Sequence, residues 1–121
     1  MNITIQVLSV AVAIEFFYIM FLETFATTST LTGKVFNMSP NELNNKNVQT
    51  LFKNQGIYNG LLGIGILYAV FLSSNTKELL LAIMAYIILV ALYGSYSSGD
   101  RLIVFKQGGL AIIVFGLLLI S

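Results

Sequence analysis

Two glutamates interrupt the first apolar stretch of the chain, and they are the residues best suited to chemistry. Glu15 and Glu23 are eight positions apart, about 80° around a helix, so one broad helical face presents both. A carboxylate inside a lipid bilayer binds a proton or pairs with a cation, because an unpaired charge there costs at least about 2.5–3.5 kcal/mol on insertion scales. We therefore predict that these two carboxyl groups face polar partners in the protein interior.

Side-chain amides that could serve as such partners lie near the start of the second apolar stretch. Gln55 and Asn59 are four residues apart, as are Asn54 and Tyr58, so each pair shares one side of a helix. Gly56, Gly60 and Gly63 form a row of small residues that lets another helix approach closely.

Lys106 is the cation that lies within an apolar stretch, and we predict that it contacts Glu15. This contact is either direct or passes through Gln107, Tyr93 or a water molecule. Glu23 is the alternative partner of Lys106, in which case Glu15 holds a proton. The candidate ligand-binding or proton-coupling residues are Glu15, Glu23, Asn54, Gln55, Tyr58, Asn59, Tyr93, Lys106 and Gln107.

Four apolar stretches must position these side chains, at approximately residues 3–23, 55–72, 79–97 and 102–120. Each is uniformly apolar rather than striped, which is typical of helices surrounded by lipid and by one another. The first is long enough to cover the roughly 30 Å of bilayer hydrocarbon. The second is short, so its helix is expected to begin near Lys53 or Asn54. We predict an all-α fold, an up-down bundle of four transmembrane helices forming one membrane domain over residues 1–121.

The connection of residues 24–53 contains the one proline of the chain and is predicted to include a short polar helix. Ser39-Pro40-Asn41-Glu42 combines a hydroxyl N-cap, proline in the first turn and Glu at the third helical position. The helix is expected over roughly Pro40–Lys53. It either lies in the membrane interface or runs directly into the second span.

Composition excludes several classes of protein. Of the 121 residues 57% are hydrophobic and only 9% are charged, whereas soluble domains carry about 25% charged residues. The mean hydropathy of +0.88 agrees with a membrane protein. A formal net charge of +1 gives no electrostatic footprint for nucleic acid. The absence of cysteine and histidine excludes disulfides, thiolate chemistry and histidine-based catalysis. We predict no catalytic group, no cofactor and no metal site.

The basic residues predict how the chain is oriented. Lys34, Lys46 and Lys53 lie in the first loop and Arg101 in the third, whereas the second loop holds only Lys77. The positive-inside rule therefore places loop 24–53 in the cytoplasm and both termini outside. In an up-down bundle, the polar residues of all four stretches fall on the same side as loop 24–53. The sequence therefore predicts a polar pocket near the cytoplasmic side of the membrane.

Several motifs resemble a bacterial integral-membrane family called domain of unknown function 1304, over essentially the whole chain. They are Ile14-Glu15-Phe16-Phe17-Tyr18-Ile19, Leu22-Glu23-Thr24-Phe25, Lys34-Val35-Phe36, Met38-Ser39, Asn54-Gln55-Gly56-Ile57-Tyr58-Asn59-Gly60, Tyr93-Gly94 and Lys106-Gln107-Gly108. The run from Asn54 to Gly60 is the most specific. Phe16 stands where the family often has His, which removes a proton-sharing partner of Glu15, and Gly109-Leu110 stands where Leu-Pro is common. The resemblance implies a multi-pass, four-helix protein of the bacterial cell membrane, and it implies no activity.

Three functions are compatible with these residues. The first is binding or transport of a small molecule, with proton coupling. Because a bundle of four helices is thin, transport would favour a homodimer. Small multidrug-resistance transporters, which also place a Glu in their first helix, are an architectural analogy. The second is a structural or accessory subunit whose polar cluster fixes helix packing. The third, which we rank last, is a membrane enzyme that acts on a lipid-like substrate with a glutamate as acid or base and Tyr93 as donor. The expected partners are the lipid bilayer, a small-molecule or lipid ligand and a second copy of the chain.

Overall fold

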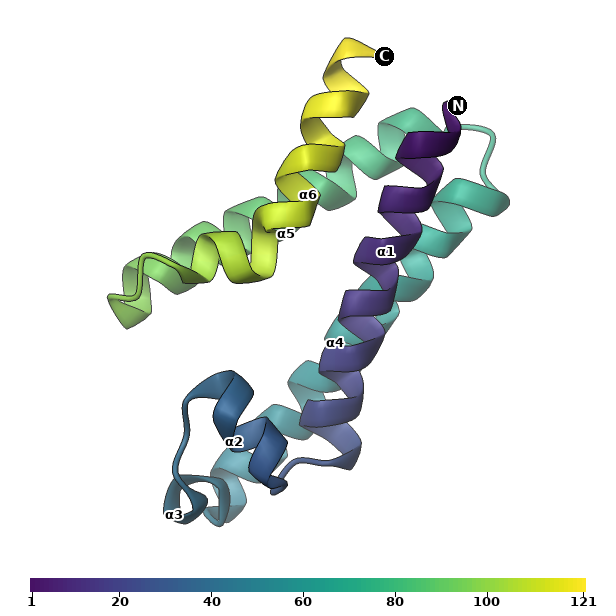
Figure 1. Ribbon diagram of the computed structural model, residues 1–121. Coiled ribbons are helices and arrows are strands. Elements are labelled where there is room, and N and C mark those ends of the chain that lie inside the picture. Colours follow the sequence, from purple (N-terminus) through teal and green to yellow (C-terminus); the bar gives the residue numbers. More distant parts are fainter. The chain divides into compact units, whose positions relative to one another are not determined.

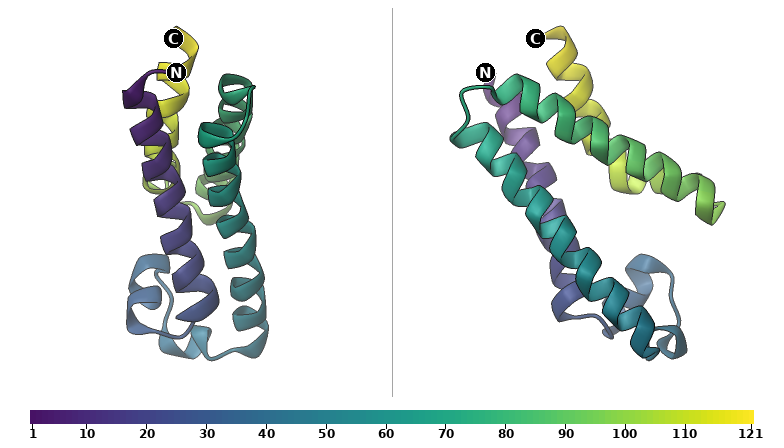
Figure 2. Two further views of the ribbon diagram at one scale, coloured as in Figure 1. Left: turned by 90° about the vertical axis from the view of Figure 1, so that its right-hand side faces the viewer. Right: turned by 180° about the vertical axis from the view of Figure 1, so that it is seen from behind.

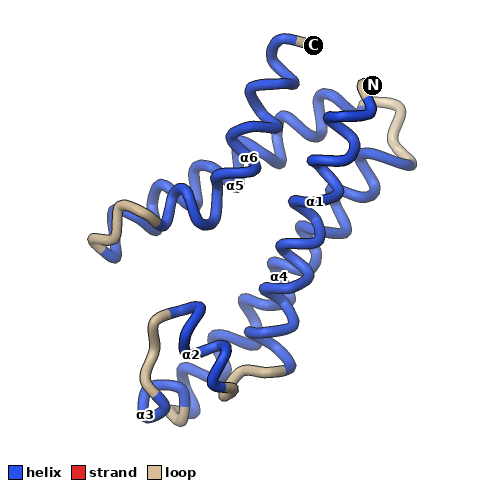
Figure 3. The backbone as a smooth tube through the Cα atoms, in the orientation of Figure 1, coloured by secondary structure: helices blue, strands red, loops and turns tan.

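A computed structural model describes residues 1–121, and the chain is entirely helical, which confirms the predicted all-α class (Figure 3). The elements are α1 (Ile3–Met20), the π-helix η1 (Phe21–Phe25), α2 (Thr30–Phe36), α3 (Pro40–Leu43), α4 (Lys46–Phe71), α5 (Thr76–Ser98) and α6 (Ile103–Ile120). Three helical segments are long and apolar enough to cross a membrane: Ile3–Phe25, Thr76–Ser98 and Ile103–Ile120. The predicted second span lies in α4, whose first turns are polar, so the four-span bundle stays a prediction.

The chain divides into two compact units. The central unit comprises Ile14–Ile64 and therefore contains the second half of α1, η1, α2, α3 and most of α4. The terminal unit comprises Met1–Ala13 and Gly65–Ser121, with α5 and α6 as its main elements.

Within the central unit, α1 and α4 run side by side, as both views in Figure 2 show. The glycine row of α4 explains why they lie so close. A Cβ atom on Gly56 would collide with the Thr24 hydroxyl, and one on Gly60 would collide with the sulfur of Met20. The prediction that these glycines admit another helix is confirmed at both positions, because only hydrogen occupies the space that a side chain would fill.

The loop of residues 26–45 forms two short helices, α2 and α3, beside the start of α4 (Figure 1). The predicted capping box is present, because Ser39 N donates to Glu42 Oε1 at 2.9 Å and Glu42 N donates to Ser39 Oγ at 3.2 Å. The expected single helix over Pro40–Lys53 is wrong. Asn45 interrupts it by accepting hydrogen bonds at its Oδ1 from the backbone N–H groups of Asn47 and Val48, which starts a new helix.

The helix that starts there, α4, continues without a break to Phe71. It confirms the alternative in which the polar helix runs directly into the second apolar stretch, and it begins earlier than the expected start near Lys53. The helix α2 was not predicted, because its seven residues are too few to show a periodic apolar pattern. Ser29 caps it by accepting a hydrogen bond from Thr32 N at 3.1 Å.

The capping box predicts a local pH dependence. The hydrogen bonds from Ser39 to the Glu42 carboxylate lower the pKa of Glu42 below its ordinary 4.5. A carboxyl group whose pKa is lowered by folding stabilises the fold above its unfolded pKa, and this contribution is lost as pH falls through the folded pKa. We expect the amide proton signal of Ser39 in NMR spectra to shift upfield on acidification with a midpoint below 4.5. Glu42→Gln, which retains the cap, should remove this titration.

In the terminal unit, α5 and α6 pack along each other through small and aliphatic side chains. Leu80, Met84, Ile87 and Ala91 are buried on α5, and Gly108, Ala111, Val114 and Leu118 are buried on α6. Gly99 ends α5 in the left-handed conformation with a φ of 76°. Ser95 Oγ accepts a hydrogen bond from Val104 N at 2.8 Å, which ties the first turn of α6 to the end of α5.

Candidate functional site

The carboxyl group of Glu23 is the most enclosed charged group of the chain, and two amide side chains of α4 hold it. Gln55 Nε2 donates to Glu23 Oε2 at 2.9 Å, and Asn59 Nδ2 donates to Glu23 Oε1 at 2.6 Å. The side chain of Glu23 is 0% exposed. We refer to Glu23, Gln55 and Asn59 as the Glu23 site.

The backbone of both helices explains why these three side chains meet. Gln55 and Asn59 share one side of α4 because they are four residues apart. Gly56 lies between them, and its missing side chain leaves room for Glu23, whose Cβ would lie 3.1 Å from a Cβ at position 56. Thr24 Oγ1 donates to the backbone oxygen of Lys53 at 3.0 Å, which fixes the two helices against each other beside the site.

Glu23 belongs to a π-helical turn, which sequence reasoning did not find. The N–H of Ala26 donates to the carbonyl of Phe21 at 2.9 Å, five residues back, and the helix ends there. π-Helical turns are rare and frequently occur at functional sites.

Buried threonine hydroxyls hold the backbone around Glu23. Thr27 Oγ1 donates to the Glu23 carbonyl at 2.6 Å. Thr32 Oγ1 lies 3.1 Å from the Leu22 carbonyl and 2.7 Å from the Ala26 carbonyl, with geometry suitable for donating to both. The carbonyls of Leu22 and Glu23 belong to the end of a helix, where carbonyl groups commonly lack a partner within the helix. This cap was not predicted from the sequence, and the threonine-rich run from Thr24 to Thr32 is the feature that could have indicated it.

The chemistry of the Glu23 site follows from its partners, which are both amides. A side-chain amide has a donor and an acceptor that exchange places when the group rotates by 180°. Both amides can donate to an ionised carboxylate, and after rotation one of them can accept a hydrogen bond from a protonated carboxyl group. The site can therefore hold the carboxyl group in either protonation state without moving the backbone.

The remaining predicted site residues of the central unit do not join the Glu23 site. Asn54 and Tyr58 lie on an exposed side of α4, and Tyr58 is 74% exposed. Glu15 is also exposed within the structure. The predicted grouping of all these side chains therefore reduces, within the central unit, to Glu23 with Gln55 and Asn59.

Tyr93, Lys106 and Gln107 belong to the terminal unit, where their side chains are exposed. The rings of Tyr93 and Tyr96 lie 6.1 Å apart, centroid to centroid, on the last turns of α5. The contact between Glu15 and Lys106 stays a prediction, because these two residues belong to different units.

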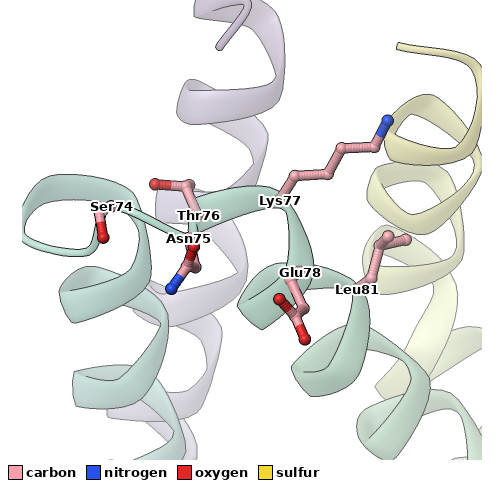
Figure 4. A pocket seen from close by; sticks show the side chains of 6 residues that line it. All are labelled: Ser74, Asn75, Thr76, Lys77, Glu78 and Leu81. Atoms are coloured by element: carbon pink, nitrogen blue, oxygen red, sulfur yellow. The ribbon is translucent and has the colours of Figure 1, made fainter.

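The terminal unit offers a further candidate site. A hollow of about 560 Å³ at the start of α5 is lined by Ser74, Asn75, Thr76, Lys77, Glu78 and Leu81 (Figure 4). Its lysine extends away toward α6, where Lys77 Nζ donates to the backbone oxygen of Ser121 at 2.9 Å, so the hollow holds no grouped functional side chains. No three Asp or Glu side chains gather anywhere to hold a metal ion.

Comparisons with known proteins agree with the resemblance seen in the sequence. The family model described as "Protein of unknown function (DUF1304)" matches residues 10–119. The chain is also similar to the "Uncharacterized protein YpaA" of Lactococcus lactis subsp. lactis (strain IL1403), with 58% identity over 113 residues, which are 93% of this chain and 94% of that protein. No solved structure matches. The matched segment includes Glu23, Gln55 and Asn59 and most of each of the three apolar helical segments, so this chain belongs to the DUF1304 family, and its three apolar helices fit a bacterial membrane protein.

Proposed function

We propose that this protein binds a small molecule at the Glu23 site and moves it across the membrane in exchange for a proton. The observation that carries the proposal is the environment of Glu23. Its carboxyl group lies in the apolar segment Ile3–Phe25, is fully buried, and is held only by amides that accommodate both protonation states. Ionisable groups in membrane segments commonly mark proton or substrate pathways.

A single carboxyl group provides the coupling in this proposal. An ionised carboxylate removed from water needs a proton, a cation or several hydrogen bonds. A cationic molecule and a proton would therefore compete for Glu23, and release of one would accompany binding of the other. Small organic cations are the class of ligand that this chemistry favours.

The finer architecture is part of the same proposal. Four spans with loop 24–53 in the cytoplasm would place the Glu23 site near the cytoplasmic side, since Glu23 lies at the end of the first segment. Because one chain of this length makes a thin bundle, transport would involve a second copy.

A second function, that of a structural subunit, is favoured by the complete hydrogen bonding of the Glu23 carboxyl group. Both carboxylate oxygens have a hydrogen-bond donor, and the side chain is 0% exposed. Such a cluster also fits a structural subunit, in which Glu23 fixes the register of α1 against α4. In that case the carboxyl group would keep one protonation state throughout the working pH range.

Infrared spectroscopy distinguishes the two functions. For the protein in lipid, we expect a carboxylic-acid carbonyl band to appear and disappear reversibly as the pH is lowered and raised. Glu23→Gln should remove this band, whereas Glu78→Gln, which changes an exposed glutamate outside the site, should leave it in place. A spectrum without any titrating band that depends on Glu23 would favour the structural function.

A further inference from the structure

A hollow of about 650 Å³ lies between α2 and α3 in the central unit, separate from the Glu23 site. Its volume is within the range of roughly 300–1,000 Å³ that is usual for small-molecule sites. The polar groups of its wall include the side chains of Thr30, Lys34, Asn37 and Glu42. The wall thus offers one cation, Lys34, and one carboxylate, Glu42, together with several neutral hydrogen-bonding groups.

Short-range contacts make the wall a defined surface. Gly33 contacts the backbone of Met38 so closely that a Cβ atom would lie 2.8 Å from the Met38 oxygen. The capping box fixes α3, and it occupies only Oε1 of Glu42, which leaves Oε2 as a free acceptor. Thr32 secures the opposite side of α2 through its bonds to Leu22 and Ala26.

The helix α2 has three faces, and their order around the helix places an exposed apolar surface next to the hollow. Thr32 and Phe36 anchor one face, since Thr32 is buried and the Phe36 ring lies 5.2 Å from the ring of Phe52. Thr30, Gly33 and Lys34 line the hollow on the second face. Leu31 and Val35, which are 48% and 47% exposed, form the third face, and a helix with 100° per residue places them directly beside Lys34.

If the segment Ile3–Phe25 spans a membrane, the position of α2 just after it brings this exposed apolar face to the membrane surface. The apolar segment Ile3–Phe25 ends only four residues before α2 begins, and Phe25 itself is 71% exposed. Exposed aliphatic side chains beside a lysine are typical of helices that lie in the interface, with the aliphatic face in the acyl region and the lysine at the headgroups. The hollow next to Lys34 then opens at the level of the lipid phosphates.

We propose that this hollow binds the headgroup of an anionic phospholipid, specifically a phosphodiester that carries a polyol such as glycerol. Lys34 pairs with the phosphate, and Thr30, Asn37 and the free oxygen of Glu42 bond the headgroup hydroxyls. Leu31 and Val35 lie among the acyl chains. Residues 26–53 carry a net charge of +2, because they contain Lys34, Lys46 and Lys53 but only one acidic residue, Glu42. This positive charge favours an anionic lipid. The proposal requires a membrane location but does not depend on the function of Glu23.

Native mass spectrometry of the detergent-purified protein mixed with defined lipids tests the proposal. We expect phosphatidylglycerol to be retained about tenfold more strongly than phosphatidylcholine, the difference that one charge-assisted contact typically makes. Phosphatidylmethanol, which has the same charge but no headgroup hydroxyl, should be retained less than phosphatidylglycerol. Equal retention of all three lipids would overturn the proposal.

Two lysine variants separate a built site from general attraction to basic residues. Lys34→Gln should remove most of the preference for phosphatidylglycerol. Lys46→Gln, which removes the same charge from the same loop outside the hollow, should retain it. Equal effects of the two variants would overturn the site. Soluble glycerophosphoglycerol should compete only weakly, and strong competition would show that the ligand is a free phosphodiester rather than a lipid.

Discussion

Replacing Glu23 by Gln is expected to abolish proton-driven exchange of the organic cation ethidium in proteoliposomes. Wild-type protein should accumulate ethidium on one side when a pH gradient is applied, with protons moving in the opposite direction. Glutamine keeps the shape of glutamate and still bonds to the amides of Gln55 and Asn59, one of which rotates to present its oxygen. A glutamine side chain neither ionises nor takes up a proton as the pH changes, so folding should survive whereas exchange should not.

The measurement is ethidium fluorescence together with a trapped pH indicator, at matched amounts of reconstituted protein. Glu78→Gln is the control, because it makes the same chemical change at an exposed glutamate on α5. Wild-type rates in the Glu23→Gln protein would contradict proton coupling at this site. Loss of exchange in Glu15→Gln, with exchange retained in Glu23→Gln, would show that Glu15 is the group that couples exchange to protons.

Gly56→Ala is expected to destabilise the protein more than Gly60→Ala or Gly65→Ala, the changes at two other glycines of α4. The added methyl group would collide with the Thr24 hydroxyl and lie 3.1 Å from the Cβ atoms of Glu23 and Thr24. These atoms lie close to the backbone of a hydrogen-bonded turn, so they cannot move aside as the end of a long side chain would. Overpacking of this kind typically costs about 1–3 kcal/mol, and it would also disturb the hydrogen bonds to Glu23.

Two other glycines provide matched controls for this prediction. A Cβ atom on Gly60 would meet the flexible thioether of Met20, so Gly60→Ala should destabilise less. A Cβ atom on Gly109 in α6 has no heavy atom within 4 Å, and Gly109→Ala should stabilise its helix by about 0.5–1 kcal/mol. Unfolding in mixed micelles followed by circular dichroism gives the three free energies. The opposite order, with Gly56→Ala neutral, would show that α1 and α4 do not approach as closely as the structure indicates.

The helical class, the apolar segments and the capping box at Ser39 could be predicted from the sequence because each depends on neighbouring residues. Long apolar runs form helices wherever water is excluded, and Ser39 bonds to Glu42 only three residues away. The pairing of Gln55 with Asn59 on one side of a helix was equally local. The family resemblance was also carried by short motifs, and the match to residues 10–119 confirmed it.

The identity of the carboxylate that meets these amides was decided only by the tertiary structure. Spacing alone offered Glu15 and Glu23 as alternatives, and the choice depends on the rotation of α1 relative to α4. Gly56 and Gly60 permit the close approach of Thr24 and Met20, and Glu23, within the π-helical turn Phe21–Phe25, meets Gln55 and Asn59 there. Contacts between residues more than thirty positions apart depend on how two helices pack, and neither helix contains that information by itself.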